Sequence, residues 1–166
     1  RVFDNIEEDK GQYDDSAEIF WASGTAFITR RSIFERIGGF DQTLFAHMEE
    51  IDYHWRCHLM GYSVWVEPKS IIHHLGGGTL AYGSPEKIYL NHRNSILLMI
   101  TNYSFFVSIY LFFPRLVMEL LSFLKYFISG KFDHAWAQMR ALGWIFGHPH
   151  IIAHRRWKSW KLRTVK

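Results

Sequence analysis

Three carboxylates cluster within residues 48–52, and their types and spacing suit proton transfer: Glu49, Glu50 and Asp52. Apolar residues recur at intervals of four through 48–60, which predicts a helix that begins beside these acids. Glu49 and Asp52 then share one face, whereas Glu50 points about 100° away from Glu49. Aromatic and apolar residues around the cluster can raise the pKa of a carboxylate toward that of a general base.

The same acids also fit a purely structural role. The N-terminal end of a helix carries a partial positive charge, so acidic side chains in the first turn stabilise the helix without doing chemistry. The sequence leaves both interpretations open.

Two histidines, His73 and His74, precede the run Gly76–Gly77–Gly78. This pattern predicts a short strand followed by a glycine-rich loop, which is where ligands bind in open α/β sheets. A histidine there can ligate a metal, contact a phosphate or serve only as a loop residue. The glycines match neither the Walker loop nor the dinucleotide-binding pattern.

A basic residue, Arg93, lies in a predicted helix. Ser84 is a good N-cap and Pro85 fits the first helical position, so the helix should begin there and continue past Asn94. From this helix Arg93 could form a surface ion pair or contact a pyrophosphate.

Strands and helices are expected to alternate around these residues. We expect strands at 25–29, 62–66 and 70–74, and a helix at 31–37 that ends at Gly38–Gly39. Residues 1–83 are therefore expected to form an α/β domain. A hydrophobic content of 48% excludes intrinsic disorder, and a single cysteine excludes an internal disulfide.

The C-terminal region 84–166 has a different character. From Asn94 to Pro114, 21 residues carry no charge, and about 20 apolar residues can span a bilayer. Polar residues at 102–104 predict a break between two helices, and 133–146 predicts a further helix. These helices could pack as a core or lie in the membrane interface. The sequence does not decide whether residues 94–128 span the membrane.

Charge is distributed unevenly along the chain. Residues 1–18 hold seven acids against two bases, whereas residues 131–166 hold eight bases against one acid. Trp157 and Trp160 alternate with basic residues, which suits the headgroup layer of an anionic membrane. Nucleic acid would attract the same residue types, but we expect a membrane partner and no nucleic acid. Binding to anionic vesicles should then depend on Arg155, Arg156, Lys158 and Lys161.

Six motifs follow one another along the chain: Ser23–Gly24–Thr25–Ala26, Ile37–Gly38–Gly39–Phe40–Asp41, Glu49–Glu50–Ile51–Asp52, Gly61–Tyr62, His74–Leu75–Gly76–Gly77–Gly78–Thr79 and Asn91–His92–Arg93–Asn94. Their order resembles the C-terminal half of a family 2 glycosyltransferase of the GT-A fold, in its non-processive, rhamnosyltransferase-like branch. The resemblance is strongest over 19–95. It implies an α/β fold, the acceptor-side part of a GT-A domain, followed by amphipathic, interfacial helices.

The resemblance also implies a reaction, the inverting transfer of a sugar from a nucleotide-diphosphate donor to a hydroxyl acceptor in cell-surface polysaccharide or glycolipid synthesis. Glu50 takes the place of the general base, where the family usually has Asp. Glu49 and Asp52 match flanking acids that orient the base or bind acceptor hydroxyls. His74 matches a histidine that completes a Mg²⁺ or Mn²⁺ site. Substrate contacts are implied for Trp21, Ser23, Gly24, Gly76, Gly77 and Arg93.

The family's donor-binding half, with its metal-binding Asp-x-Asp, should lie upstream of Arg1. We therefore expect no useful transferase activity from this chain alone. We expect the protein at the cytoplasmic face of the cell membrane, with an acceptor that could be lipid-linked. Two other classes stay open: a non-catalytic membrane-docking or partner-binding module derived from a transferase, and a metal-dependent hydrolase.

Overall fold

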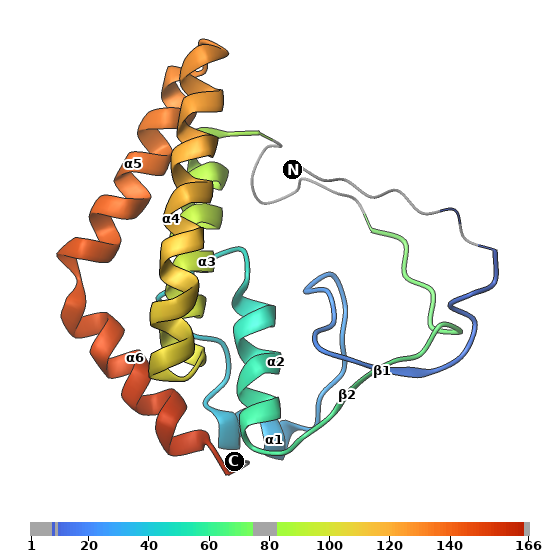
Figure 1. Cartoon of the computed structure of the whole chain (residues 1–166). Coiled ribbons are helices and arrows are strands. Elements are labelled where there is room, and N and C mark those ends of the chain that lie inside the picture. Colours follow the sequence, from blue (N-terminus) through green and yellow to red (C-terminus); the bar gives the residue numbers. More distant parts are fainter. Residues whose placement is uncertain (1–7, 9, 75–82, 165–166) are drawn as a thin grey trace.

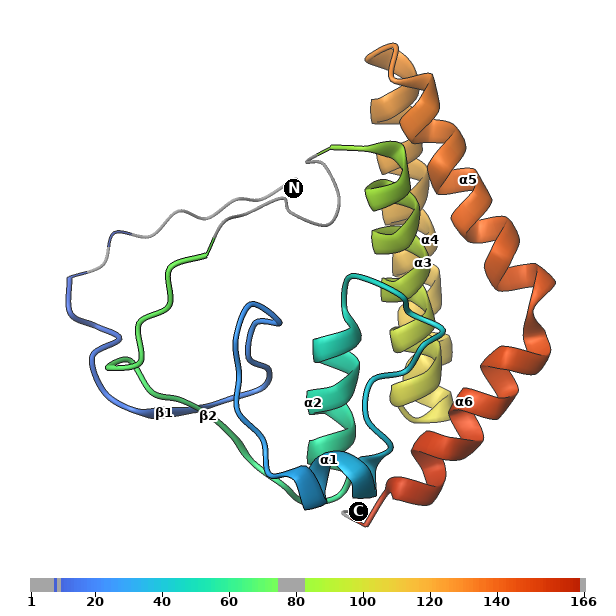
Figure 2. The same ribbon diagram turned by 180° about the vertical axis from the view of Figure 1, so that it is seen from behind.

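The computed structural model describes residue 8 and residues 10–74 and 83–164. The helices and strands of this part follow in chain order: β1 (Ala17–Ile19), α1 (Arg31–Ile37), α2 (Glu49–Leu59), β2 (Val64–Val66), α3 (Pro85–Asn102), α4 (Phe105–Ile128), α5 (Phe132–Gly147) and α6 (Pro149–Leu162). Long helices dominate: α3 and α4 lie side by side, and α5 and α6 form a bent arm beside them (Figures 1 and 2).

Local signals place most helix ends correctly. Ser84 Oγ accepts a hydrogen bond from the main-chain amide of Lys87 at 3.3 Å, and Pro85 is the first residue of α3. Helix α1 ends at Gly38, whose φ of 89° is a left-handed conformation that glycine adopts without steric cost. The predicted break at 102–104 separates α3 from α4. These helix predictions are confirmed.

The strand predictions fare less well. The strand expected at 62–66 is present as β2, which pairs antiparallel with β1. The strands expected at 25–29 and 70–74 are wrong, because neither segment is a strand here. Strands need hydrogen-bonded neighbours, and Ile28 and Ile71 are instead exposed, Ile28 fully. The described part is mostly helical, so the α/β class stays a prediction.

Helix α3 lies at the centre of the packing. Its Ile96 and Leu97 pack with Leu44, from the loop before α2, and with Ile145 of α5. A second cluster joins α1, α2 and β2 through Ile37, Tyr53, Cys57 and Val64. Because Leu44 precedes the expected boundary at residues 83 and 84 while Ile96 follows it, the two expected regions share one core.

Candidate functional site

The loop that leads into α2 is strained. Phe45, His47 and Met48 have φ values of 61°, 66° and 70°, which place three side-chain-bearing residues in the left-handed region within four positions. Each such residue costs of order 1–3 kcal/mol and persists only where surrounding structure holds it. Met48 is the N-cap of α2, so the strain lies directly before Glu49 and Glu50.

Helix α3 holds this loop in place mainly through the side chain of Asn94. The Nδ2 atom of Asn94 donates to the main-chain oxygens of Leu44, Ala46 and His47 at 3.0, 2.9 and 2.7 Å. Asn94 is fully buried. Through this amide, three carbonyls of residues 44–47 are hydrogen-bonded to α3.

The side chain of Glu50 lies against Gly24, in the loop that also contains Ser23. A Cβ atom built on Gly24 would lie 3.4 Å from Glu50 Cδ, so the absent side chain leaves room for the carboxyl group. Glu50 is half-buried. Two segments of the expected site, 21–25 and 49–52, are thus brought together. Ser23 Oγ accepts a hydrogen bond from the amide of Thr25, which shapes this loop.

Burial raises the pKa of the Glu50 carboxyl above its ordinary value. The neighbouring charge of Glu49 raises it further, while backbone hydrogen bonds from Gly24 and from the start of α2 oppose the shift. A carboxylate with a raised pKa is a stronger base than an exposed one. The electrostatics at Glu50 match the requirements of a general base.

Glu49 and His47 lie beside Glu50 and keep free hydrogen-bonding capacity. Within the described residues, Glu49 Oε2 and His47 Nε2 are buried atoms without a hydrogen-bond partner. Burial lowers the pKa of His47, so its imidazole is neutral near pH 7. Buried polar atoms without partners are costly, and here they lie next to the strained loop. They could bind hydroxyl groups of a ligand.

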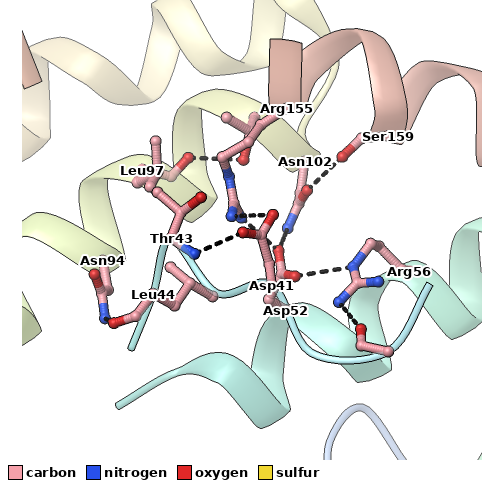
Figure 3. A network of polar contacts seen from close by, with 12 residues as sticks. Asp41, Thr43, Leu44, Asp52, Arg56, Asn94, Leu97, Asn102, Arg155 and Ser159 are labelled. Atoms are coloured by element: carbon pink, nitrogen blue, oxygen red, sulfur yellow. Dashed lines mark hydrogen bonds and ion pairs between the residues drawn. The ribbon is translucent and has the colours of Figure 1, made fainter. Parts of the chain in front are cut away.

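Asp52 has a different environment, although it lies in the same turn of α2. Only 1% of it is exposed, and Figure 3 shows it among polar side chains from three helices. Its carboxylate pairs with Arg56 Nε at 2.9 Å and Arg155 NH2 at 2.8 Å, and accepts from Asn102 Nδ2 at 3.2 Å. These contacts give both oxygens of Asp52 a partner, so in this geometry Asp52 stabilises the packing of α2 against α3 and α6.

The ion-pair network continues to the loop after α1. Arg155 NH1 lies 2.6 Å from Asp41 Oδ2, and Asp41 Oδ1 accepts from the Thr43 amide at 2.9 Å (Figure 3). Burial alone would raise the pKa of Asp41, but Arg155 and the hydrogen bonds from Thr43 hold it below its usual value. A cavity of about 520 Å³ borders this network, between the 38–43 loop and α6.

Arg93 also hydrogen-bonds main-chain carbonyls of the protein. It is 8% exposed, and its Nη2 atom donates to the carbonyls of Thr43 and Leu44 at 2.8 and 3.0 Å. Its guanidinium lies over the rings of Tyr89 and Trp144. The predicted phosphate contact finds no support in this geometry, because the side chain is buried and directed at the strained loop.

The remaining expected site residues are not assembled around Glu50. His74 is exposed, and the segment 67–74 lies well apart from α2 in both views (Figures 1 and 2). Gly76 and Gly77 lie outside the described residues. Trp21 is 43% exposed, at the start of the loop that carries Ser23 and Gly24.

A divalent cation needs several oxygen or nitrogen ligands around one point. The part of the chain that the structure describes brings no three His, Cys, Asp or Glu side chains together in such an arrangement. His74 alone does not fit a Mg²⁺ or Mn²⁺ site. The metal therefore stays a prediction.

Sequence reasoning missed the positioning roles of Asn94, Asp41 and Arg155. Asn94 and Asp41 lie within motifs noted above, but their types alone do not reveal which carbonyl or cation each would meet. Arg155 was expected to contact lipid, and it is 4% exposed. Its position on one face of α6 with Ser159, which is also buried, is the periodic signal that could have separated it from Lys158.

Comparison with known proteins finds a partial match. The chain is 38% identical over 60 residues to the N-acetylglucosaminyl-diphospho-decaprenol L-rhamnosyltransferase of Mycobacterium tuberculosis, in each of two strains. The match covers 36% of this chain and 20% of the relative, so the chain spans a minor part of the relative's length. No family model matches, and no solved structure matches. Part of this chain is thus similar in sequence to a glycosyltransferase.

Proposed function

We propose that this chain is the acceptor-side part of a glycosyltransferase that transfers a sugar, with inversion, from a nucleotide-diphosphate donor to a hydroxyl group. The observation that carries the proposal is the placement of Glu50, a half-buried carboxyl of raised pKa against Gly24, at the end of a strained loop. The partial similarity to a rhamnosyltransferase supports the same class of reaction.

In the proposed reaction, the acceptor hydroxyl oxygen forms a bond to the anomeric carbon of the donor sugar. The bond from that carbon to the diphosphate breaks, and the nucleoside diphosphate leaves with the electron pair. Glu50 accepts the hydroxyl proton. The leaving phosphate needs no proton, so one carboxylate is enough, unlike the pair of carboxyl groups in glycoside hydrolysis.

The neighbouring side chains would orient the acceptor. Glu49 Oε2 and His47 Nε2 are unpartnered within the described residues, and a sugar hydroxyl could donate to one and accept from the other. Asp52, Arg93 and Asn94 would not touch the substrate. They position Glu50 indirectly, because they hold α2 and its preceding loop.

The name of the relatives contains a decaprenol diphosphate, which is a lipid carrier. We extend this to the present chain as a proposal: the acceptor is lipid-linked, and the protein works at the cytoplasmic face of a membrane. The exposed apolar surface of α4 and the basic residues of α6 are what support the proposed contact with a membrane. We expect the 166-residue chain by itself not to turn over nucleotide sugars; robust turnover that depends on Glu50 would contradict this.

The direct test replaces Glu50 by Gln in the full-length natural protein. The loss of the general base should lower the rate of sugar transfer by about 10²–10⁴. Glu35→Gln, an exposed glutamate on α1, is the matched control and should leave the rate unchanged. Transfer that continues at the original rate in Glu50→Gln would contradict the assignment.

A second candidate function is a non-catalytic membrane-docking module derived from a transferase. The observation that favours it is α4, a 24-residue apolar helix. Only 11% of its most apolar 18-residue stretch is buried inside the protein. On this alternative, Glu50→Gln would leave every measured activity of the full-length protein unchanged, while membrane binding would still depend on α4.

A further inference from the structure

The cavity of about 520 Å³ between the 38–43 loop and α6, named the α6 cavity below, has no role in the proposed sugar transfer. Its volume lies in the range of small-molecule sites, which is roughly 300–1,000 Å³. Neither Glu50 nor Gly24 is among the described residues that line it. The α6 cavity is therefore a second place where a ligand could bind.

Paired charges hold the walls of the α6 cavity in place. Arg155 forms ion pairs with Asp41 at 2.6 Å and with Asp52 at 2.8 Å (Figure 3). Arg56 pairs with Asp52 as well, and it donates to two main-chain carbonyls at the end of α1 at 2.9 and 2.7 Å. All four of these charged residues line the cavity. Both acids are thus neutralised by arginines and leave no surplus negative charge.

Two lysines of α6 give the lining a surplus of positive charge. Lys158 and Lys161 line the cavity, and both are exposed to solvent. In the part of the chain that the structure describes, neither of them forms an ion pair. Lys161 Nζ lies 3.7 Å from the centre of the Trp157 ring, a contact in which the ammonium group keeps its charge. The cavity therefore favours an anion.

Arg155 adds a hydrogen-bond donor that the protein does not use. It is 4% exposed, and its Nε atom has no hydrogen-bond partner among the described residues. A buried donor without an acceptor costs free energy. Because Arg155 lines the α6 cavity three residues before Lys158, on the same side of α6, a ligand oxygen in the cavity could supply the missing acceptor.

The apolar part of the lining indicates that the anion has an organic part. Ile37, Phe40 and Leu162 line the cavity together with the charged residues. A phosphate monoester carries a charge of about −1.5 to −2 at pH 7, which matches two lysines better than the single charge of a carboxylate. Lysine and arginine are both frequent partners of phosphate groups.

We propose that the α6 cavity binds a phosphate monoester, whose phosphate group contacts Lys158, Lys161 and Arg155 and whose organic part lies against Ile37 and Phe40. A soluble phosphorylated compound and a lipid with a terminal phosphate offer the same chemistry. The experiment therefore uses one probe for each source.

Binding to the full-length protein is measured with both probes. Calorimetric titration with glycerol 3-phosphate tests the soluble source. Sedimentation with phosphatidylcholine vesicles that contain phosphatidic acid tests the lipid source, and vesicles of equal surface charge made with phosphatidylglycerol, a phosphodiester, are the comparison. We expect glycerol 3-phosphate to bind, or phosphatidic acid to bind more tightly than phosphatidylglycerol. No binding of glycerol 3-phosphate together with equal binding, or none, to the two kinds of vesicle would overturn the proposal.

Lysine substitutions assign the binding to the α6 cavity. Lys158→Gln combined with Lys161→Gln should weaken binding of the probe at least tenfold, because the surplus charge of the lining is lost. Lys125→Gln combined with Lys131→Gln removes the same charge from exposed positions outside the lining and should leave binding unchanged. Equal effects of the two double substitutions would overturn the proposal, since the phosphate would then be bound elsewhere or by overall charge.

A charge added to the wall gives an independent check. Gln42 is exposed and lines the cavity, so Gln42→Glu should preserve the fold and weaken binding at least fivefold by repelling the phosphate group. Unchanged binding in this variant would contradict the proposed site. Because Glu50 does not line the cavity, loss of sugar transfer in Glu50→Gln and loss of phosphate binding in the lysine variant are separate results.

Discussion

The two sides of the first turn of α2 hold chemically similar carboxyl groups in opposite states. Asp52 is fully enclosed and paired with Arg56 and Arg155. Glu50, two residues earlier, is half-buried, lies against Gly24 and has a raised pKa. Acids at a helix start can stabilise the helix or do chemistry, and this turn separates the two roles between neighbouring residues.

The difference follows from what each side of α2 packs against. The Asp52 side faces α3 and α6, which supply the Asn102 amide and the Arg155 guanidinium to Oδ1, while Arg56 of α2 itself pairs with Oδ2. The Glu50 side faces a loop whose glycine offers space and a backbone amide but no cation. Burial raises the pKa of a carboxyl group that has no cation beside it. Residues with shifted pKa values are frequent at functional sites.

The largest expected effect on stability comes from removing Arg155, which pairs with Asp41 and Asp52. Arg155→Met leaves Asp41 without its cation and Asp52 with one cation instead of two. Removing one partner of a buried ion pair costs about 3–5 kcal/mol. The free energy of unfolding from a denaturant titration measures it. Lys158→Met, on the exposed side of α6, should change stability by less than about 0.5 kcal/mol; equal effects would mean that the network is not stabilising.

The next largest effect comes from removing Asn94, which holds the strained loop before Glu50. Asn94→Ala removes three hydrogen bonds to the strained loop, so unfolding should become easier by about 2–3 kcal/mol, and sugar transfer should slow because Glu50 loses its position. The same two measurements on Asn91→Ala, one turn earlier in α3, provide the control. Full activity in Asn94→Ala would show that the strained loop does not position the base.

A smaller effect distinguishes the two acids by pH. Because the pKa of Glu50 is raised in the folded state, its protonated form is favoured there, and its contribution to stability declines as pH rises from about 4.5 through the folded pKa. Glu50→Gln should therefore equal or exceed the wild type in unfolding free energy at pH 7. Asp52→Asn should instead be destabilised at that pH. Destabilisation of both variants to the same extent would remove the contrast.

How far the sequence predicts this arrangement depends on the range of the interactions. Helix starts and stops are local, so Ser84 and Gly38 were sufficient to place α3 and the end of α1. The cluster at 49–52 was recognised for the same reason. The pairing of Asp52 with Arg155 joins residues 103 positions apart, and nothing in either residue's neighbourhood indicates it.

Other features were out of reach for different reasons. The positive φ values of His47 and Met48 could not be foreseen from residue type, since the loop is held by hydrogen bonds from Asn94 on another helix. The strand expected at 25–29 failed because the segment is apolar but has no neighbouring strand in the described structure. The roles of Gly76, Gly77 and the metal remain predictions that no observation here tests.

The central claim is that Glu50 removes the proton from the acceptor hydroxyl. The pH dependence of kcat/KM for sugar transfer by the full-length protein tests it most directly. The account predicts an ascending limb whose midpoint lies above the ordinary pKa of a glutamate, and the disappearance of that limb in Glu50→Gln. An ascending limb that persists unchanged in the variant would assign the proton transfer to another group.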